Sequence, residues 1–408
     1  MRRTRLYHPP ALTKGWLMNQ EIPMAIPDLS GNEQKYASEA VASSWISSIG
    51  PFIKRFETEF AESCNCDYAL GTSSGTTALH LAVSGLGLKP GDEVIVPSLT
   101  YISTANAITY CGATPVFVDV DPATWCIDPA KIEAAITNKT KGIIPVHLLG
   151  HPADMDPIIN LATTHGLWVV EDAAEAIFAR YKGRLCGSLG NAAIFSFFGN
   201  KVLTSGEGGA VSCNDNHLKN RLSQLRGQGM DPNRRYHFPI IGFNYRMTNV
   251  AAAILCGQME RRDEILARRK EIVKLYDQQL ATIPGIYVRT NASWATVSPW
   301  LASCIVNPDI FGCDRNELAK DLREEGVDTR PLFEPIHRMP PYREAAKQRS
   351  TELPTTDRLA DYGLMLPTYP QLSNDQVLFI CARIREHGTG SNLHIPSKIS
   401  GMQWLRAA

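Results

Sequence analysis

Segments suited to strands and to helices alternate along the first half of the sequence. Runs suited to buried strands lie at residues 68–70, 93–97, 115–120, 143–147 and 167–171, and stretches suited to helices separate them. Repeated strand–helix units favour a mostly parallel sheet that is covered by helices. We therefore expect an α/β fold in which ligands gather at the carboxyl ends of the strands.

The chain is long enough for more than one domain, because it has 408 residues. A long helical stretch over residues 248–280 is expected to join a large domain to a smaller α+β domain that begins near residue 285. The predicted organisation is an irregular N-terminal extension (1–24), a large α/β domain (25–265), a linking helix with a small C-terminal domain (266–387) and a tail (388–408).

Composition argues against several classes of partner. Lys and Arg together number 41, as do Asp and Glu, so no net charge favours nucleic acid or an acidic membrane surface. The ten cysteines show no paired metal-ligand spacing, which predicts reduced thiols and no metal site. Residues 94–118 carry no charge but contain prolines and a glycine, unlike a bilayer span. With no apolar signal segment near the N-terminus, we expect a cytoplasmic protein.

A single lysine, Lys201, lies between an apolar run at residues 192–198 and a glycine cluster at 206–209. A lysine held between buried strands loses hydration, which favours the neutral amine. A neutral amine can form a Schiff base with an aldehyde. The alternative from this stretch alone is a solvated lysine beside a turn.

Three other strand ends carry candidate ligand residues. Gly75 and Thr76 open a helix after the first strand, where backbone N–H groups can bind a phosphate, although Ser, Thr and Gly also cap ordinary helices. Tyr101 follows the second strand and can stack on a planar ring, unless it is a half-buried core residue. Asp172 ends an apolar strand and can hold a ring nitrogen protonated, unless it caps a helix beginning at residue 173. Glu175 would share a helical face with Asp172.

Together these residues supply what pyridoxal 5′-phosphate requires. The cofactor needs its phosphate fixed, its pyridine nitrogen protonated and its aldehyde joined to a lysine. Gly75 and Thr76, Tyr101, Asp172 and Lys201 fill these needs in this order along the chain. The combination therefore predicts a pyridoxal-phosphate site.

At these residues the chain resembles the nucleotide-sugar aminotransferases of pyridoxal-phosphate fold type I, the DegT/StrS-like proteins. The resemblance covers residues 26–387. It is carried by the motifs Trp45-Ile-Ser-Ser, Phe195-Ser-Phe-Phe-Gly-Asn-Lys, Gly206-Glu-Gly-Gly, Gly242-Phe-Asn-Tyr-Arg-Met-Thr-Asn and Thr329-Arg-Pro-Leu-Phe-Glu-Pro-Ile-His. The sequence Val202-Leu-Thr-Ser after the lysine departs from the Thr-Ile-Thr-Thr that is usual in the relatives it resembles most.

The resemblance implies roles for individual residues. It makes Lys201 the residue that bonds to the cofactor and Asp172 the partner of the pyridine nitrogen. The other residues that it assigns to the cofactor are Gly75, Thr76, Tyr101, Glu175, Ser196, Asn244 and Arg246. Those that it assigns to the substrate are Trp45, Ser47, Arg330 and His337. For Arg330, a plain surface arginine remains the alternative.

The activity implied by the resemblance is transfer of an amino group from L-glutamate to a nucleotide-linked 4-keto-6-deoxyhexose. GDP-4-keto-6-deoxymannose is the first expected substrate, and dTDP- or UDP-linked sugars or 3-keto sugars are alternatives. A sugar dehydratase on the same scaffold is disfavoured, because related dehydratases carry histidine at the position of Lys201. A non-catalytic pyridoxal-phosphate-binding regulator has no support from a DNA-binding helix pair or a basic patch.

Residues 238–249 predict an interface. The segment begins apolar and ends in a helix cap, with Asn244 and Arg246 on a turn-like stretch. The resemblance implies a homodimer in which this segment reaches the partner's cofactor phosphate. An ordinary loop within one chain is the alternative, because asparagine often forms local turns.

Overall fold

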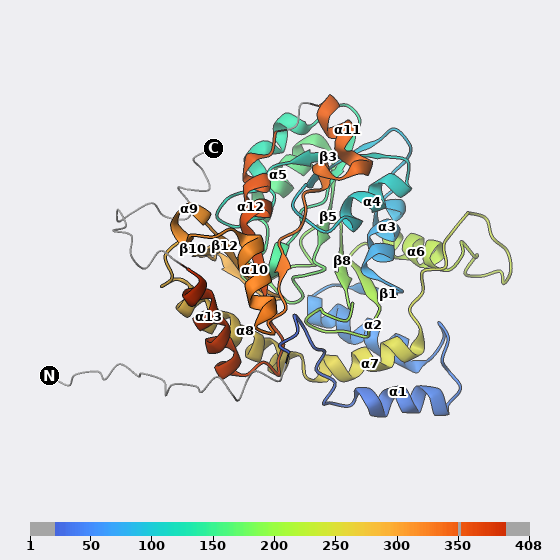
Figure 1. Cartoon of the computed structure of the whole chain (residues 1–408). Coiled ribbons are helices and arrows are strands. Elements are labelled where there is room, and N and C mark those ends of the chain that lie inside the picture. The colour runs from blue at the N-terminus through green and yellow to red at the C-terminus, as the bar shows by residue number, and fades with distance from the viewer. Residues whose placement is uncertain (1–20, 350–351, 389–408) are drawn as a thin grey trace.

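The computed structural model describes residues 21–349 and 352–388 (Figure 1). Its largest sheet has seven strands, and all neighbouring strands are parallel except β9, which runs antiparallel to both of its neighbours. The strands in spatial order are β1 (Tyr68–Thr72), β9 (Gly209–Cys213), β8 (Ala192–Ser196), β5 (Trp168–Asp172), β4 (Thr140–Ile143), β2 (Glu93–Pro97) and β3 (Thr114–Val118). The predicted α/β fold with a mostly parallel sheet is confirmed.

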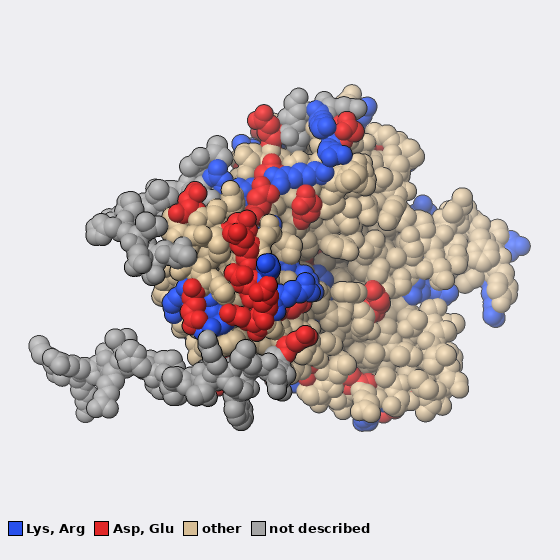
Figure 2. All heavy atoms as spheres, viewed as in Figure 1, with Lys and Arg blue, Asp and Glu red and all other residues tan. Residues whose placement is uncertain are grey.

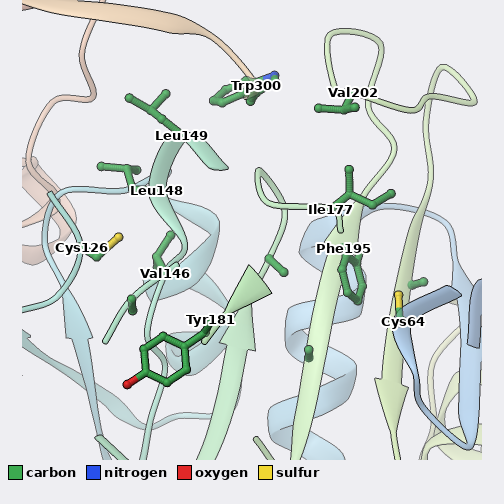
Figure 3. Packing of buried hydrophobic residues seen from close by; sticks show 14 of the residues in the cluster. Cys64, Cys126, Val146, Leu148, Leu149, Ile177, Tyr181, Phe195, Val202 and Trp300 are labelled. Carbon is green, nitrogen blue, oxygen red and sulfur yellow. The ribbon is translucent and has the colours of Figure 1, made fainter. Parts of the chain in front are cut away.

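Helices cover both faces of this sheet. Successive residues of a strand point to opposite faces, so in β2 Ile95 enters one core while Val94 and Val96 enter the other. The core that holds Ile95 is closed by α2 (Pro51–Cys64), α5 (Met155–His165) and α7 (Asn249–Glu260), and Figure 3 shows part of its packing. The opposite core is closed by α3 (Gly75–Gly85), α4 (Ser103–Tyr110) and α6 (Asn216–Arg226). The helix α1 (Glu33–Ala42) lies along α7.

A second sheet of four strands forms the smaller layer. Its strands in spatial order are β10 (Ile286–Val288), β12 (Ala302–Val306), β14 (Gly363–Leu366) and β13 (Arg330–Pro331). The helices of this part are α8 (Arg262–Leu280), α9 (Pro308–Phe311), α10 (Arg315–Glu324), α12 (Pro354–Tyr362) and α13 (Asn374–His387). Its core joins apolar residues of α8, α10 and α13 to the sheet. The helix α11 (Pro340–Gln348) instead packs on the large layer through Tyr342 and Ala346. A three-stranded sheet of β11 (Ala295–Thr296), β6 (Arg180–Tyr181) and β7 (Arg184–Leu185) ties the segment after β10 to the large layer.

Three predicted elements differ from the structure. The helical stretch expected at 248–280 is broken at Arg261, which ends α7 and pairs with Asp28. Residues 129–136, in one of the stretches between predicted strands that were expected to be helical, form two short 3-10 turns, Pro129–Lys131 and Glu133–Ala135. The strand expected at 143–147 begins earlier, as β4, and the residues after β4 stay beside β5 through a parallel bridge between Val146 and Asp172.

Only the last four residues of the predicted N-terminal extension are among the described residues. Residues 21–24, which were assigned to the irregular extension, are extended, and Ile22 bridges to Val327 of the smaller layer. The rest of the predicted extension and the tail from residue 389 lie outside the described residues. The ten cysteines are free thiols, as predicted. Among the described helices, none is long and apolar enough to cross a bilayer.

Candidate active site

A cavity of about 720 Å³ lies where the carboxyl ends of the large sheet meet the smaller layer. Residues from both parts line it. They include Met24, Ser74, Gly75, Thr76, Tyr101, Ser103, Thr104, Asp172, Glu175, Ser196, Lys201, Trp300, Asp328, Arg330 and Phe333. The structure thus brings together seven of the predicted cofactor residues and one of the predicted substrate residues.

Lys201 lies in the tight connection between β8 and β9. Its amine is 3.7 Å from a carboxylate oxygen of Glu175 and 3.7 Å from the centroid of the Trp300 ring. Burial lowers the pKa of this amine, and the carboxylates of Glu175 and Asp172 act in the opposite direction. Because its side chain is only 13% exposed, the solvated-loop alternative is wrong. A buried amine with a lowered pKa is suited to act as a nucleophile and to carry a proton.

Asp172 is the last residue of β5 and is almost fully buried. Its Oδ2 accepts a hydrogen bond from Thr104 Oγ1 at 2.8 Å, and its Oδ1 accepts one from the backbone N–H of Ala174 at 3.2 Å. Burial raises its pKa, while these two donors and Lys201 favour the charged form. No helix begins at residue 173, so the helix-cap alternative is wrong.

Glu175 lies in the cavity beside Lys201, but on a turn and not on the predicted helix. The residues after Asp172 form turns instead of a helix, and Glu175 still points toward Lys201. Its Oε2 accepts a hydrogen bond from the backbone N–H of Leu149 at 2.8 Å. Burial raises the pKa of its carboxyl, and Lys201 and the Leu149 N–H counter that rise.

The start of α3 and the end of β8 approach each other closely. A Cβ placed on Gly75 would lie 2.9 Å from the Cβ of Ser196, so only glycine fits without displacing the serine. Thr76 Oγ1 lies 2.7 Å from Ser103 Oγ. Ser74 caps the helix through the N–H of Thr77, and the N–H groups of Gly75 and Thr76 precede the first intrahelical bond. Capping and anion binding are therefore compatible at this helix start.

Tyr101 is 60% exposed and lines the cavity, so its interpretation as a core residue is wrong. Its ring lies 6.2 Å from that of Phe333, which comes from the smaller layer. Arg330 also lines the cavity and is paired with Asp328. These residues form the rim of the cavity on the side of the smaller layer.

Five predicted residues do not line this cavity within one chain. The backbone of Asn244 forms an antiparallel β-bridge with Gly227, and the backbone of Arg246 forms one with Thr72 of β1. Trp45 and Ser47 lie in the exposed segment between α1 and α2. The remaining residue, His337, faces away, with its ring nitrogens 2.8 Å from Ser98 Oγ and 3.2 Å from an Asp357 carboxylate oxygen.

Sequence reasoning missed Thr104 and Trp300. Thr104 follows the same strand as Tyr101, so its place at a strand end was a usable signal. Trp300 lies next to Lys201 in space but is 99 positions later, and its Nε1 donates to Asn200 O at 2.9 Å. No local pattern around Trp300 indicates this contact.

A buried group of His147, Glu171 and Cys186 is the one place among the described residues where metal-ligand atoms cluster. The carboxylate of Glu171 already accepts hydrogen bonds from His147 Nε2 and from the backbone N–H groups of residues 187, 189 and 190. His147 Nδ1 accepts one from the N–H of Ala153. Because these lone pairs are in use, the group suits a structural hydrogen-bond network better than a metal ion.

The donor set of the cavity fits pyridoxal 5′-phosphate. It offers a buried amine at Lys201, a buried carboxylate at Asp172 and an exposed aromatic ring at Tyr101. In the same cavity, the helix start at Gly75 faces the hydroxyl of Ser196 without an intervening Cβ. An aldehyde, a ring nitrogen and a phosphate therefore each find a matching group.

Comparisons with known proteins agree with this chemistry. Residues 27–385 match the DegT/DnrJ/EryC1/StrS aminotransferase family. GDP-perosamine synthase of Caulobacter vibrioides is 49% identical over 356 residues, which are 87% of this chain and 95% of that protein. GDP-perosamine synthase of Escherichia coli O157:H7 is 44% identical over 90% of this chain and 98% of its own length. The crystal structure of DesV from S. venezuelae with a ketimine intermediate matches with a TM-score of 0.82 at 37% identity, covering 89% of this chain and 98% of DesV.

Proposed function

The chain belongs to the DegT/DnrJ/EryC1/StrS aminotransferase family and is a pyridoxal-phosphate-dependent nucleotide-sugar aminotransferase, and we propose that its product is GDP-perosamine. In this reaction L-glutamate gives its amino group to GDP-4-keto-6-deoxymannose and leaves as 2-oxoglutarate. The observation that carries the proposal is the buried Lys201 amine opposite Asp172, in a chain 49% identical to a GDP-perosamine synthase.

We propose the following roles for residues of this chain. Gly75, Thr76 and Ser196 hold the cofactor phosphate, and Tyr101 lies against the ring. Asp172 accepts a hydrogen bond from the pyridine nitrogen, and Glu175 lies beside the ring hydroxyl.

Bound pyridoxal phosphate supplies an electron sink for negative charge that develops on the carbon next to the transferred nitrogen. Lys201 Nζ would hold the cofactor through its aldehyde between turnovers. With glutamate bound in its place, Nζ would take the proton from that carbon and give it to the carbon on the other side of the transferred nitrogen. Burial lowers the pKa of this amine, which favours the neutral form that can accept the proton. For the keto sugar, Lys201 Nζ would make the same proton transfers in reverse order.

Two further candidates remain as alternatives. A dTDP- or UDP-linked keto sugar or a 3-keto sugar is one, since a dTDP-3-amino-3,4,6-trideoxy-alpha-D-glucose transaminase of Streptomyces venezuelae is 40% identical. The other is a regulator without catalysis, because a protein of Geobacillus stearothermophilus named pleiotropic regulatory protein is 36% identical. The presence of Lys201 beside Glu175 favours catalysis over the second alternative.

We also propose a homodimer whose active sites are shared. The loop between α6 and α7 projects from the body of the molecule (Figure 1). It exposes apolar side chains, with Tyr236 73%, Phe238 50% and Ile241 93% accessible. Figure 2 shows few charged residues over most of the large layer on the side of this loop. Such a surface suits contact with a second copy.

In that dimer we propose that Asn244 and Arg246 reach the partner's cofactor phosphate. Trp45 and Ser47 would contact the substrate from the same interface, and Arg330 and His337 would do so from the smaller layer. Consistent with this proposal, α1 and the segment before α2 lie beside α7, which follows the loop. We propose that a large domain ends at residue 265 and that a linking helix and a small domain follow it. In this division the cavity lies between the large and the small domain.

The proposed location is the cytoplasm, where nucleotide sugars are made and where free thiols persist. We propose that the product feeds the assembly of O-antigen in lipopolysaccharide. A relative from Bacillus subtilis named spore coat polysaccharide biosynthesis protein SpsC, 35% identical over 92% of this chain, supports a role in polysaccharide synthesis.

An assay with a panel of keto sugars tests the proposal. The purified chain is given L-glutamate with GDP-4-keto-6-deoxymannose, dTDP-4-keto-6-deoxyglucose or a 3-keto nucleotide sugar. We expect the highest turnover with the GDP sugar and one 2-oxoglutarate for each amino sugar formed. Preference for another sugar supports the first alternative. A lack of glutamate-dependent turnover with every sugar contradicts the proposed aminotransferase activity. Lys201→Ala serves as the inactive control.

A further inference from the structure

The turn Leu148–Gly150 of the large layer is held by the segment that follows β10 of the smaller layer. Arg289 donates from Nη1 to Leu148 O at 2.8 Å and from Nη2 to Leu149 O at 3.2 Å. The backbone N–H of Ser298 donates to Gly150 O at 3.0 Å. Three consecutive carbonyls of one turn therefore accept hydrogen bonds from Arg289 and Ser298.

This turn has a backbone conformation that needs outside support. Leu149 has φ 51° and ψ 32°, a left-handed conformation that a leucine rarely adopts. A Cβ on Gly150, with φ 83°, would overlap the carbonyl oxygen of Ser298. Such conformations persist where surrounding contacts determine them. Arg289 and Ser298 supply those contacts.

The left-handed conformation points a backbone donor into the active site. The N–H of Leu149 donates to Glu175 Oε2, and the other carboxylate oxygen of Glu175 lies 3.7 Å from Lys201 Nζ. Figure 3 shows Leu148 and Leu149 on this turn, with Trp300 beyond Leu149. A continuous line of contacts thus runs from the Arg289 guanidinium through Leu149 and Glu175 to the Lys201 amine.

The charges around this line act on Glu175 in opposite directions. Lys201, the Leu149 N–H and Arg289 lower the pKa of the Glu175 carboxyl, and burial and Asp172 raise it. Lys201 itself faces Glu175, Asp172 and the Trp300 ring. Arg289 favours the ionised carboxylate both by its own charge and by holding the turn.

The other titratable groups near Arg289 are Asp277, Cys126 and His151. None of them is among the groups that act on the Lys201 amine, which faces Glu175 and Asp172. The effect of Arg289 on Lys201 therefore passes through Glu175.

We propose that Arg289 is a positioning residue for Glu175 and, through it, for the protonation of the Lys201 amine. The smaller layer thereby controls the proton-carrying group of the larger one. The inference deepens the proposed function, because it depends on Lys201 as the amine that moves the proton.

A groove of about 420 Å³ makes this proposal testable by chemical rescue. Arg289 lines it together with Trp125, Leu149, Asp277 and other residues. When Arg289 is shortened to alanine, the space of the lost guanidinium is continuous with this groove. Guanidinium ion can therefore enter from solution and restore the two donors to the carbonyls.

The experiment uses the full chain without cofactor and follows acylation of Lys201 by peptide mass spectrometry across a pH series. We expect Arg289→Ala to move the labelling midpoint of Lys201 to lower pH by about one unit, because a less ionised Glu175 stabilises the ammonium form less. Millimolar guanidinium chloride should reverse the shift, and sodium chloride should not. Glu175→Gln should lower the midpoint as well, and adding Arg289→Ala to it should lower it no further.

Arg268→Ala is the matched control, since Arg268 also donates to two carbonyls of the smaller layer, those of Pro370 and Leu372, away from the cavity. Its midpoint should equal that of the unaltered chain. If Arg289→Ala does not fold, Arg289→Lys keeps the charge with fewer donors and should give a smaller shift in the same direction. An unchanged midpoint, or an equal shift in the Glu175→Gln background, overturns the proposal. Absence of turnover with every keto sugar would contradict the proposed function without altering this measurement.

Discussion

The hydroxyl of Thr104 donates a 2.8 Å hydrogen bond to Oδ2 of Asp172, although the two residues come from different strand–helix units. Thr104 lies in the first turn of α4 after β2, and Asp172 ends β5. Burial favours the protonated form of this carboxyl, and the donated hydrogen bond favours the charged form. Thr104 therefore helps to keep a carboxylate available for a cationic ring nitrogen.

Asp172→Asn should lower turnover by about 10²-fold to 10³-fold with little loss of folding stability. A neutral amide keeps the shape but cannot stabilise a protonated ring nitrogen. Thr104→Val should cost about tenfold, since it removes one hydrogen bond to the charge. Steady-state rates and thermal unfolding of both variants check this. Near-normal turnover of Asp172→Asn would show that the carboxylate has no electronic role.

Gly75→Ala should weaken binding of pyridoxal phosphate by about tenfold or more, because the new Cβ would displace Ser196 from the phosphate position. Titration of the cofactor-free chain with pyridoxal phosphate, followed by absorbance, gives the dissociation constant. Gly227→Ala is a control, as its added Cβ would meet only ordinary contact distances. Equal affinity for both variants would argue against the phosphate site at Gly75.

The sequence supported the site better than it supported the local structure around it. Lys201 and Asp172 were found because strand ends in a parallel sheet meet at one edge, whatever the loops between them do. Glu175 was placed on a helix that does not exist, since burial of the turn and the Leu149 contact override local propensity. Trp300 and Arg289 act through contacts between the two layers, and no short-range pattern encodes such contacts.

Lys201 should carry the cofactor covalently. The purified protein is expected to be yellow, and borohydride reduction should fix the pyridoxyl mass on the peptide that contains Lys201. Peptide mapping by mass spectrometry reads the position directly. Lys182, an exposed lysine that pairs with Asp156, is the internal control and should stay unlabelled. A label on any lysine other than Lys201 would overturn the assignment.

His151 should make the fold sensitive to acid. Its buried ring donates from Nδ1 to Pro152 O and accepts from the N–H of Ala292 at Nε2, which requires the neutral form. Burial, with a contribution from Arg289, lowers its pKa from 6.5 to about 3. Between these two pKa values the unfolded chain binds a proton at His151 and the folded chain does not. The contribution of His151 to the free energy of unfolding is therefore fully present above pH 6.5 and falls as the pH drops toward 3.

The loss should be about 1.4 kcal/mol for each pH unit below 6.5. Urea unfolding followed by tryptophan fluorescence at neutral and acidic pH measures it. His151→Gln should be less stable at neutral pH and should lose less stability on acidification. The exposed His165, changed to Gln, should leave the slope as it is. Parallel slopes for the His151 variant and the unaltered chain would contradict the role of this ring.

The last prediction concerns the loop between α6 and α7. Asn244 and Arg246 do not line the cavity of their own chain, while the loop that carries them exposes Tyr236, Phe238 and Ile241. If the loop completes the partner's site, Lys201→Ala and Asn244→Ala chains should each be inactive. Refolded together, they should form heterodimers that contain one intact site and should recover up to about a quarter of the activity expected for a full set of sites. Native mass spectrometry establishes that heterodimers form, and mixing Lys201→Ala with Asp172→Asn, which alter the same site, is the control that should recover nothing. Heterodimers without recovered activity would show that the loop serves its own subunit.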